Sequence, residues 1–141
     1  MNKSTRYLYF IIIAITGVLI FLPGISSFFN SDDFVWLRNS QKISFEATLH
    51  FAVNFIPVLK FRPFTHLIFQ FLYAIFRLNS TGYHLTSLFL HIINALIFYA
   101  LLMRFTSDAK LSLFASLIFV SHFAQEETLL WISALSIPLV T

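Results

Sequence analysis

Two adjacent aspartates, Asp32 and Asp33, are the side chains in this sequence best suited to chemistry. They follow a hydrophobic N-terminal segment and lie within the stretch Asn30–Leu37. A carboxylate at the centre of a bilayer costs roughly 2.5–3.5 kcal/mol, so we expect the pair at a membrane surface or in a loop. Carboxylates placed there can bind a metal ion or remove a proton from a substrate. A simpler interpretation is that Asp32 caps a short surface helix.

A second acidic pair, Glu126 and Glu127, separates two apolar stretches near the end of the chain. Arg62 precedes a proline at the start of another apolar segment. A guanidinium in that position can hold a phosphate through parallel hydrogen bonds, or it can simply extend to lipid headgroups. If all these groups share one membrane face, they form a site for a lipid-phosphate substrate, with Asp32 and Glu126 as ligands for a divalent cation.

Polar residues also recur inside a long apolar stretch. His84, Ser87, His91 and Asn94 are spaced by three and four residues, so they share one face of a helix. We consider His84 and His91 as contacts for a polar substrate. The alternative is that the stripe forms hydrogen bonds between membrane helices. The two histidines are two turns apart, too far for one helix to chelate a single ion.

Composition identifies the class of protein. Of 141 residues, 58% are hydrophobic and 11% charged, with a mean hydropathy of +0.82. Soluble domains carry about 25% charged residues, so we expect an integral membrane protein in the lipid bilayer. The sequence has no cysteine, which excludes disulfides and thiolate chemistry. Its net charge of +3 is scattered along the chain, so nucleic acid is not an expected partner.

The segments predict an all-α polytopic membrane helix bundle formed by a single module over residues 1–141. Segment 63–77 is short for a membrane span and is expected to be interfacial or re-entrant. A cleavable signal peptide is an alternative for the first helix, because small residues follow it at Gly24–Ser26. The expected membrane helices cover residues 7–22, 83–103, 111–123 and 128–141, and residues 23–62 form an extracytoplasmic loop with surface helices.

Charge asymmetry predicts the topology. Lys3 and Arg6 favour a cytoplasmic N-terminus, and the basic turn Arg104–Lys110 favours the same side. Both acidic pairs then lie on the outer face, provided that segment 63–77 does not cross. If it crosses, the pairs fall on opposite faces. The sequence stops at Thr141 within a hydrophobic run, which favours a fragment or a split protein.

Four motifs, taken in order, resemble the N-terminal part of the GT-C glycosyltransferases, in the branch of the protein O-mannosyltransferases and the TPR-bearing transmembrane O-mannosyltransferases. The third family motif reads Gly-[Tyr/Phe]-His-Leu…His…Asn-Ala, and the fourth reads His-Pro-x-His-x-Glu…Trp-Ile-Ser. The chain departs from the fourth at Phe123, Gln125 and Ala134-Leu135. The matching residues are Asp32-Asp33-Phe34, Arg62-Pro63-Phe64, Gly82-Tyr83-His84-Leu85 with His91 and Asn94-Ala95, and His122, Glu127 and Trp131-Ile132-Ser133.

The resemblance implies a multi-pass membrane enzyme, located in the cell inner membrane if bacterial. It would move a sugar from a polyprenyl-phosphate donor to an extracytoplasmic acceptor. Asp33 or Asp32 would be the catalytic base, with Asp33 slightly preferred. Arg62 would bind the donor phosphate, and Glu127 would orient the acceptor or a metal.

Family members are several hundred residues long. We therefore expect an N-terminal portion that is inactive alone and needs a missing C-terminal portion or a partner subunit. The alternative is a non-catalytic polytopic membrane protein, such as an assembly subunit, a transporter piece or a truncated remnant.

The topology predicts the labelling of single cysteines, because the native chain has none. Cysteines introduced as Ser31→Cys and Ser107→Cys should react with a membrane-impermeant maleimide from opposite faces of sealed vesicles. The parent chain, which should not react, is the control. Labelling of both positions from one face would contradict the topology.

Overall fold

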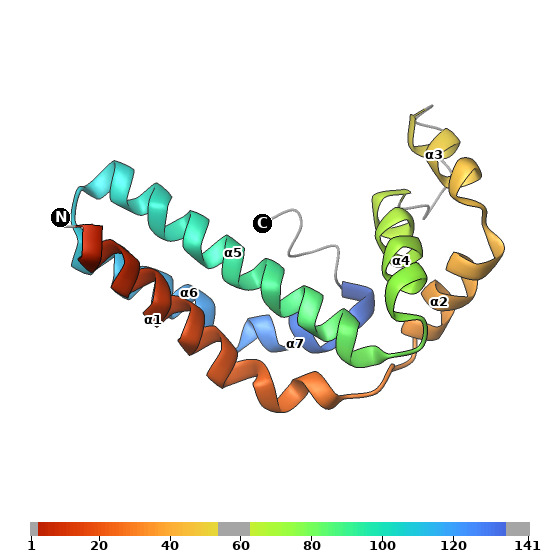
Figure 1. Cartoon of the computed structure of the whole chain (residues 1–141), viewed down its shortest axis with the longest axis horizontal. Coiled ribbons are helices and arrows are strands. Elements are labelled where there is room, and N and C mark those ends of the chain that lie inside the picture. Colours follow the sequence, from red (N-terminus) through yellow and green to blue (C-terminus); the bar gives the residue numbers. More distant parts are fainter. Residues whose placement is uncertain (1–2, 54–62, 135–141) are drawn as a thin grey trace.

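The computed structural model describes residues 3–53 and 63–134, and all regular structure in them is helical, as predicted. No strand occurs in these residues. Figure 1 shows the course of the chain. The helices are α1 (Lys3–Phe21), α2 (Asp33–Lys42), α3 (Phe45–Val53), α4 (Pro63–Phe76), α5 (Ser80–Thr106), α6 (Ala109–Ser121) and α7 (Ala124–Leu130), with short 3₁₀ helices η1 (Leu22–Ser26) and η2 (Ile132–Ala134).

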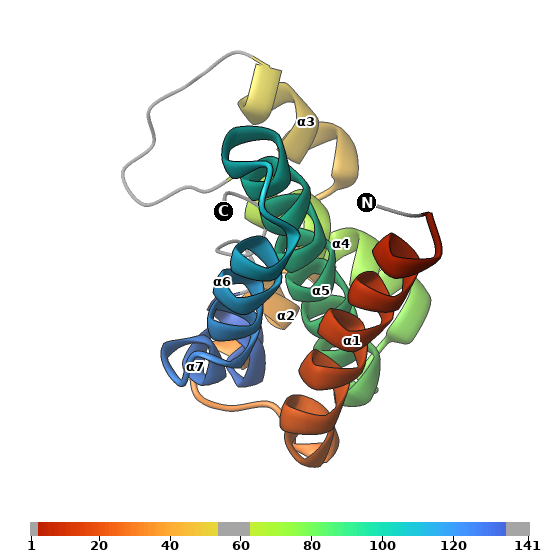
Figure 2. The same ribbon diagram turned by 90° about the vertical axis from the view of Figure 1, so that its left-hand side faces the viewer.

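Helices α1, α5 and α6 pack side by side as the main body of the fold (Figures 1 and 2). Helix α5 runs opposite to the other two. Gly17 allows close approach, because a Cβ on it would lie 3.0 Å from Val120 Cγ2 and 3.2 Å from Ile92 Cγ1. The buried core of these three helices contains Ile13, Ala95, Tyr99 and Val120.

Among the described residues, two helical segments are long and apolar enough to cross a membrane, namely Ser4–Ser26 and Ser80–Thr106. They contain the expected helices 7–22 and 83–103. Helix α1 also leaves large apolar side chains exposed, including Tyr7 and Leu19 at 62% and 67%. Such a surface is unusual for a soluble monomer and suits contact with lipid. Helix α6 has 13 residues, about 20 Å of helix, so it is short for the roughly 30 Å hydrocarbon core.

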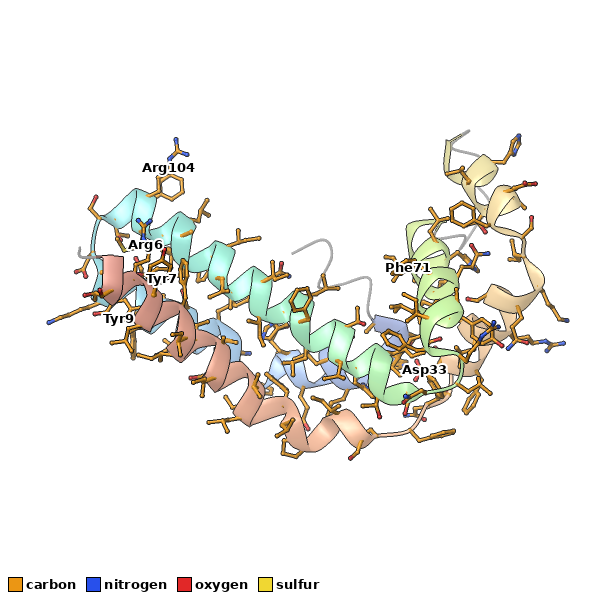
Figure 3. All side chains as sticks on the ribbon, viewed as in Figure 1. Arg6, Tyr7, Tyr9, Asp33, Phe71 and Arg104 are labelled. Carbon is orange, nitrogen blue, oxygen red and sulfur yellow. The ribbon has the colours of Figure 1, made fainter. Side chains whose placement is uncertain are left out.

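The turn between α5 and α6 explains why these helices are antiparallel. Ser107 ends α5 in the left-handed conformation, with φ 56°. Asp108 then caps α6, its Oδ1 accepting hydrogen bonds from the backbone N–H of Lys110 (2.9 Å) and Leu111 (3.1 Å). Figure 3 shows Arg6 and Arg104 at this end of the fold and Asp33 at the opposite end.

Helices α2, α3 and α4 form a second packing unit at the Asp33 end (Figure 1). The indole ring of Trp36 stacks on Phe69, with centroids 5.4 Å apart. Trp36 also lies against His66, whose burial lowers the pKa of its imidazole. The Gln70 amide donates to the Ile43 carbonyl oxygen at 2.6 Å, which ties α4 to the junction between α2 and α3. The core here contains Phe29, Leu37, Phe69, Leu72, Tyr83 and Ile132.

The end of the described chain differs from the expected membrane helix 128–141. The α-helix ends at Leu130, and Trp131 is extended, with φ −98° and ψ 103°. Residues 132–134 form the 3₁₀ helix η2, whose Ile132 is fully buried in the core of the second unit. Residues 135–141 of this prediction lie outside the described residues.

We predict that Gly17→Val destabilises the packing of α1, because the added methyl groups would meet Val120 and Ile92. Overpacking of this kind costs about 1–3 kcal/mol in the free energy of unfolding. Circular dichroism during SDS titration of the protein in mixed micelles measures it. The matched control is Leu19→Val, on the exposed side of the same helix. Equal unfolding midpoints for both variants would contradict the close packing at Gly17.

Candidate functional site

Asp33 lies at the start of α2 and is only 1% exposed. Its Oδ2 accepts a hydrogen bond from the Asn30 backbone N–H at 2.9 Å, while its own N–H donates to the Asn30 carbonyl oxygen at 2.8 Å. One side-chain and one backbone hydrogen bond thus join the two residues, and only the side-chain bond corresponds to a bond of a capping box. Its Oδ1 accepts from the backbone N–H of Ser133 at 2.7 Å, one hundred residues further along the chain. Asp33 therefore joins the first loop to the segment after α7.

His84, near the start of α5, is likewise 1% exposed and contacts two separate backbone segments. Its Nε2 lies 3.1 Å from the carbonyl oxygen of Ser27, and its Nδ1 lies 3.3 Å from that of Leu129. A neutral imidazole carries one N–H and donates to one of these oxygens, whereas an imidazolium ion donates to both. His84 thus holds the chain after η1 and the chain at α7 against α5.

Asp33 and His84 together account for the end of α7. In a continuing α-helix, the N–H of Ser133 would donate to the carbonyl oxygen of Leu129. Here Asp33 takes the N–H and His84 contacts the carbonyl. A buried backbone group without a partner costs about 1–3 kcal/mol, and these two side chains remove that cost. The helix can therefore end at Leu130 and let the chain turn back over α2.

A cleft of about 580 Å³ opens beside this turn. Glu126 and Glu127 from α7 and Asn30 from the first loop lie on its wall, so both acidic regions are at the same end of the fold. Neither glutamate has an ion-pair partner in the described part of the chain. The complete lining is Asn30, Phe123, Ala124, Glu126, Glu127, Leu130 and Trp131.

Asp32 differs from its neighbour because its carboxylate is exposed. The residue precedes α2, but its side chain makes no capping hydrogen bond, so the expected cap is not formed by Asp32. The Asp33 carboxylate accepts from Asn30 and Ser133, which both lie outside α2. Its Oδ1 lies 3.5 Å from the hydroxyl oxygen of Ser31. Asp32 does not line the cleft, whereas Glu126 does, so these two expected metal ligands are not brought together there. Within residues 3–53 and 63–134, no three potential metal-binding side chains are grouped.

The other expected substrate contacts lie away from the cleft or outside the described residues. His91 is 2% exposed, and its Nε2 lies 3.2 Å from the carbonyl oxygen of Val120, which links α5 to α6. Its ring stacks on Phe119 and meets the edge of Phe21. These contacts match the alternative interpretation, hydrogen bonding between helices. Arg62 lies outside the described residues.

Sequence reasoning did not identify Asn30, Phe123 or Trp131 as parts of the cleft, nor the role of Asn30 beside Asp33. The Asn30-x-x-Asp33 spacing contains a usable signal, since a capping residue followed three positions later by an acid marks a helix start. No local signal pairs Asp33 with Ser133, because that contact forms only when segments from distant parts of the chain pack together.

Comparisons with known proteins give no match. No protein family, no curated protein and no solved structure matches this chain. The chemistry open to the site therefore follows from its own geometry. It has one exposed carboxylate at Asp32 and two more on the wall of the cleft, beside a buried carboxylate and a buried imidazole that hold the backbone.

We predict that Asp33→Asn lowers the free energy of unfolding by about 1–3 kcal/mol, because one amide oxygen replaces two accepting oxygens and an NH₂ group then faces a backbone N–H. SDS titration measures the loss, and hydrogen exchange at the Ser133 amide should accelerate. Asp32→Asn is the control and should leave both unchanged. An equal effect of the two substitutions would contradict the assignment of Asp33 as the connecting residue.

Proposed function

We propose that this chain is the N-terminal module of a GT-C-type membrane glycosyltransferase, which moves a sugar from a polyprenyl-phosphate donor to an extracytoplasmic acceptor. One observation carries the proposal. The acidic motif around Asp33 and the motif that contains Glu127 and Ser133 are far apart in sequence, yet the hydrogen bond from Ser133 to Asp33 joins them. Two of the motifs that resemble the GT-C family thus meet at one end of the fold, beside a cleft lined by Glu126 and Glu127.

The distribution of charge supports a multi-pass arrangement. Arg6 and Arg104 lie at one end of the packed helices, and Asp33 lies at the other (Figure 3). Arg38, Lys42 and Arg77 belong to the Asp33 end, so the orientation rests on the basic N-terminus and the basic turn between α5 and α6. By the positive-inside rule, we place these two in the cytoplasm and the cleft outside. In a bacterium the membrane would be the inner membrane. In this arrangement α6 is a third crossing helix, and α4 lies in the interface.

Within this proposal, Asp32 and Asp33 have different tasks. Both carboxylate oxygens of Asp33 already accept backbone hydrogen bonds, so Asp33 is a positioning residue. The exposed carboxylate of Asp32 is the better candidate for the base, although the motif alone slightly favours Asp33. Glu127, on the wall of the cleft, orients the acceptor, and Arg62 carries the phosphate of the donor.

The transfer itself needs one bond formed and one broken. An acceptor hydroxyl oxygen attacks the anomeric carbon of the sugar, and its proton passes to the Asp32 carboxylate. The bond between the anomeric carbon and the phosphate oxygen breaks, and the polyprenyl phosphate leaves with the electron pair. The carboxylate of Asp32 is sufficient as the base in this scheme, and the expected divalent cation is a separate proposal.

A second candidate is a non-catalytic membrane protein, for example an assembly subunit. The observation that favours it is the engagement of Asp33 and His84 with backbone groups alone. Such contacts are sufficient reason for both residues to be present in a protein with no reaction to perform. The exposed Asp32 distinguishes the two candidates, because only the enzyme requires its carboxylate.

We predict that Asp32→Asn, introduced into the native gene, makes lipid-linked sugar accumulate as deletion of the gene does. Mass spectrometry of extracted polyprenyl-phosphate sugars measures the accumulation, and the abundance of the protein in the membrane should not change. Loss of a general base costs about 10²–10⁴-fold in rate. Glu46→Gln, a change at an exposed acid on α3, is the control.

Three results are distinguishable in this experiment. Accumulation in both the deletion and the Asp32→Asn strain supports the enzyme and its base. Accumulation in the deletion strain alone supports the glycosyltransferase but refutes Asp32 as its base. No accumulation in the deletion refutes the glycosyltransferase and leaves the non-catalytic protein.

A further inference from the structure

A second cleft, of about 460 Å³, adjoins the one that holds the two glutamates. The two share Phe123, Glu126 and Leu130, so they form one groove, which we call the α7 groove. The second part continues along the end of α1 and η1, and its further lining residues are Ile20, Phe21, Pro23, Gly24 and Ser121.

The two halves of the α7 groove differ in polarity. The half that contains Asn30, Glu126 and Glu127 is acidic, and no lysine or arginine is among its lining residues. The half beside α1 is mostly apolar, and its Ile20, Phe21 and Pro23 belong to the candidate span Ser4–Ser26. A ligand that fills the groove must therefore carry an apolar chain that can enter from the membrane and a polar head that tolerates negative charge.

Charge selects among the possible heads. Glu126 and Glu127 are both exposed and have no ion-pair partner in the described part of the chain. An anionic head, such as a phosphate, would be repelled by both carboxylates, whereas a cationic head would form charge-assisted hydrogen bonds with them. The proposed sugar donor carries a phosphate, so its head group would be repelled from the α7 groove by the same carboxylates.

Aromatic residues beside the carboxylates strengthen this preference. Phe123 and Trp131 both line the acidic half of the groove. Phe123 is 81% exposed; its ring stacks on His122, with centroids 4.9 Å apart, so the other face is the one open to a ligand. Aromatic faces attract cations, and the combination of aromatic rings with carboxylates is well suited to an ammonium group.

We propose that the α7 groove binds an amphiphile with an ammonium head and a single long alkyl chain. The ammonium group lies between Glu126 and Glu127 and near the ring of Phe123, and the chain runs over Ile20 and Phe21 toward the hydrocarbon core. The groove includes the cleft in which Glu127 is proposed to orient the acceptor, so the two proposals share that residue. Ammonium binding needs only the geometry of α1, η1 and α7, and it is tested without sugar transfer.

Photo-crosslinking tests this proposal with the full chain in phosphatidylcholine nanodiscs at low salt. The probe is hexadecylamine with a diazirine in its chain, and hexadecyl phosphate and hexadecyl glucoside with the same diazirine are its chain-matched comparators. Mass spectrometry should map the amine to peptides that contain Ile20–Gly24 and Ser121–Trp131. The double variant Glu126→Gln/Glu127→Gln should lower that labelling about tenfold, the loss expected when charge-assisted contacts are removed.

The control variant is Glu46→Gln, which removes an exposed acid from α3 and should leave labelling unchanged. Labelling by the phosphate and the glucoside should be weaker than by the amine and insensitive to the double variant. Amine labelling that survives the double variant would overturn the proposal. Glutamate-dependent labelling by the glucoside that equals that of the amine would also overturn it and would assign the groove to a sugar head.

Discussion

The fold at the Asp33 end depends on how two backbone groups at the end of α7 find partners. In a longer α-helix, the N–H of Ser133 would donate to the carbonyl oxygen of Leu129. Here His84 contacts the carbonyl oxygen of Leu129, and Asp33 accepts from the N–H of Ser133. Each replacement partner comes from a distant part of the chain, and both are buried. If either side chain were absent, a buried backbone group would lose its partner, so the helix end and the two loops that it touches are stabilised together.

The position of each partner is set by a different part of the fold. His84 is held by α5, whose packing against α1 and α6 forms the main body. Asp33 is held by α2, which packs on α4 around Trp36 and Phe69. The last described segment connects the two parts, because Ile132 lies in the core of the second part while Leu129 packs with Phe21 and Leu88 in the first. The cleft therefore lies where both parts meet.

Sequence reasoning predicted the features that depend on local composition. Apolar length predicted the helices that became α1 and α5. The sequence placed Glu126 and Glu127 between two helices, whereas both lie within α7. It did not predict where α7 ends, because Thr128–Val140 is apolar and its one helix-breaking residue, Pro138, lies well past the observed end at Leu130. At the break, Asp33 and His84 contact the backbone groups of this segment across 100 and 45 residues. Contacts of that range follow from packing and cannot be inferred from periodicity.

The hydrogen bond between Asp33 and Ser133 also has a consequence for biosynthesis. Its two partners are separated by 100 residues, and ribosomes add about 5–20 residues each second. The first loop is therefore made about 5–20 s before the backbone group that completes it. During this interval Asp33 can form its hydrogen bonds with Asn30 but not its contact with Ser133, and the apolar side chains that Ile132 later covers remain accessible. Aggregation and proteolysis during synthesis thus act first on the residues around α2, and protection arrives only with the last described segment.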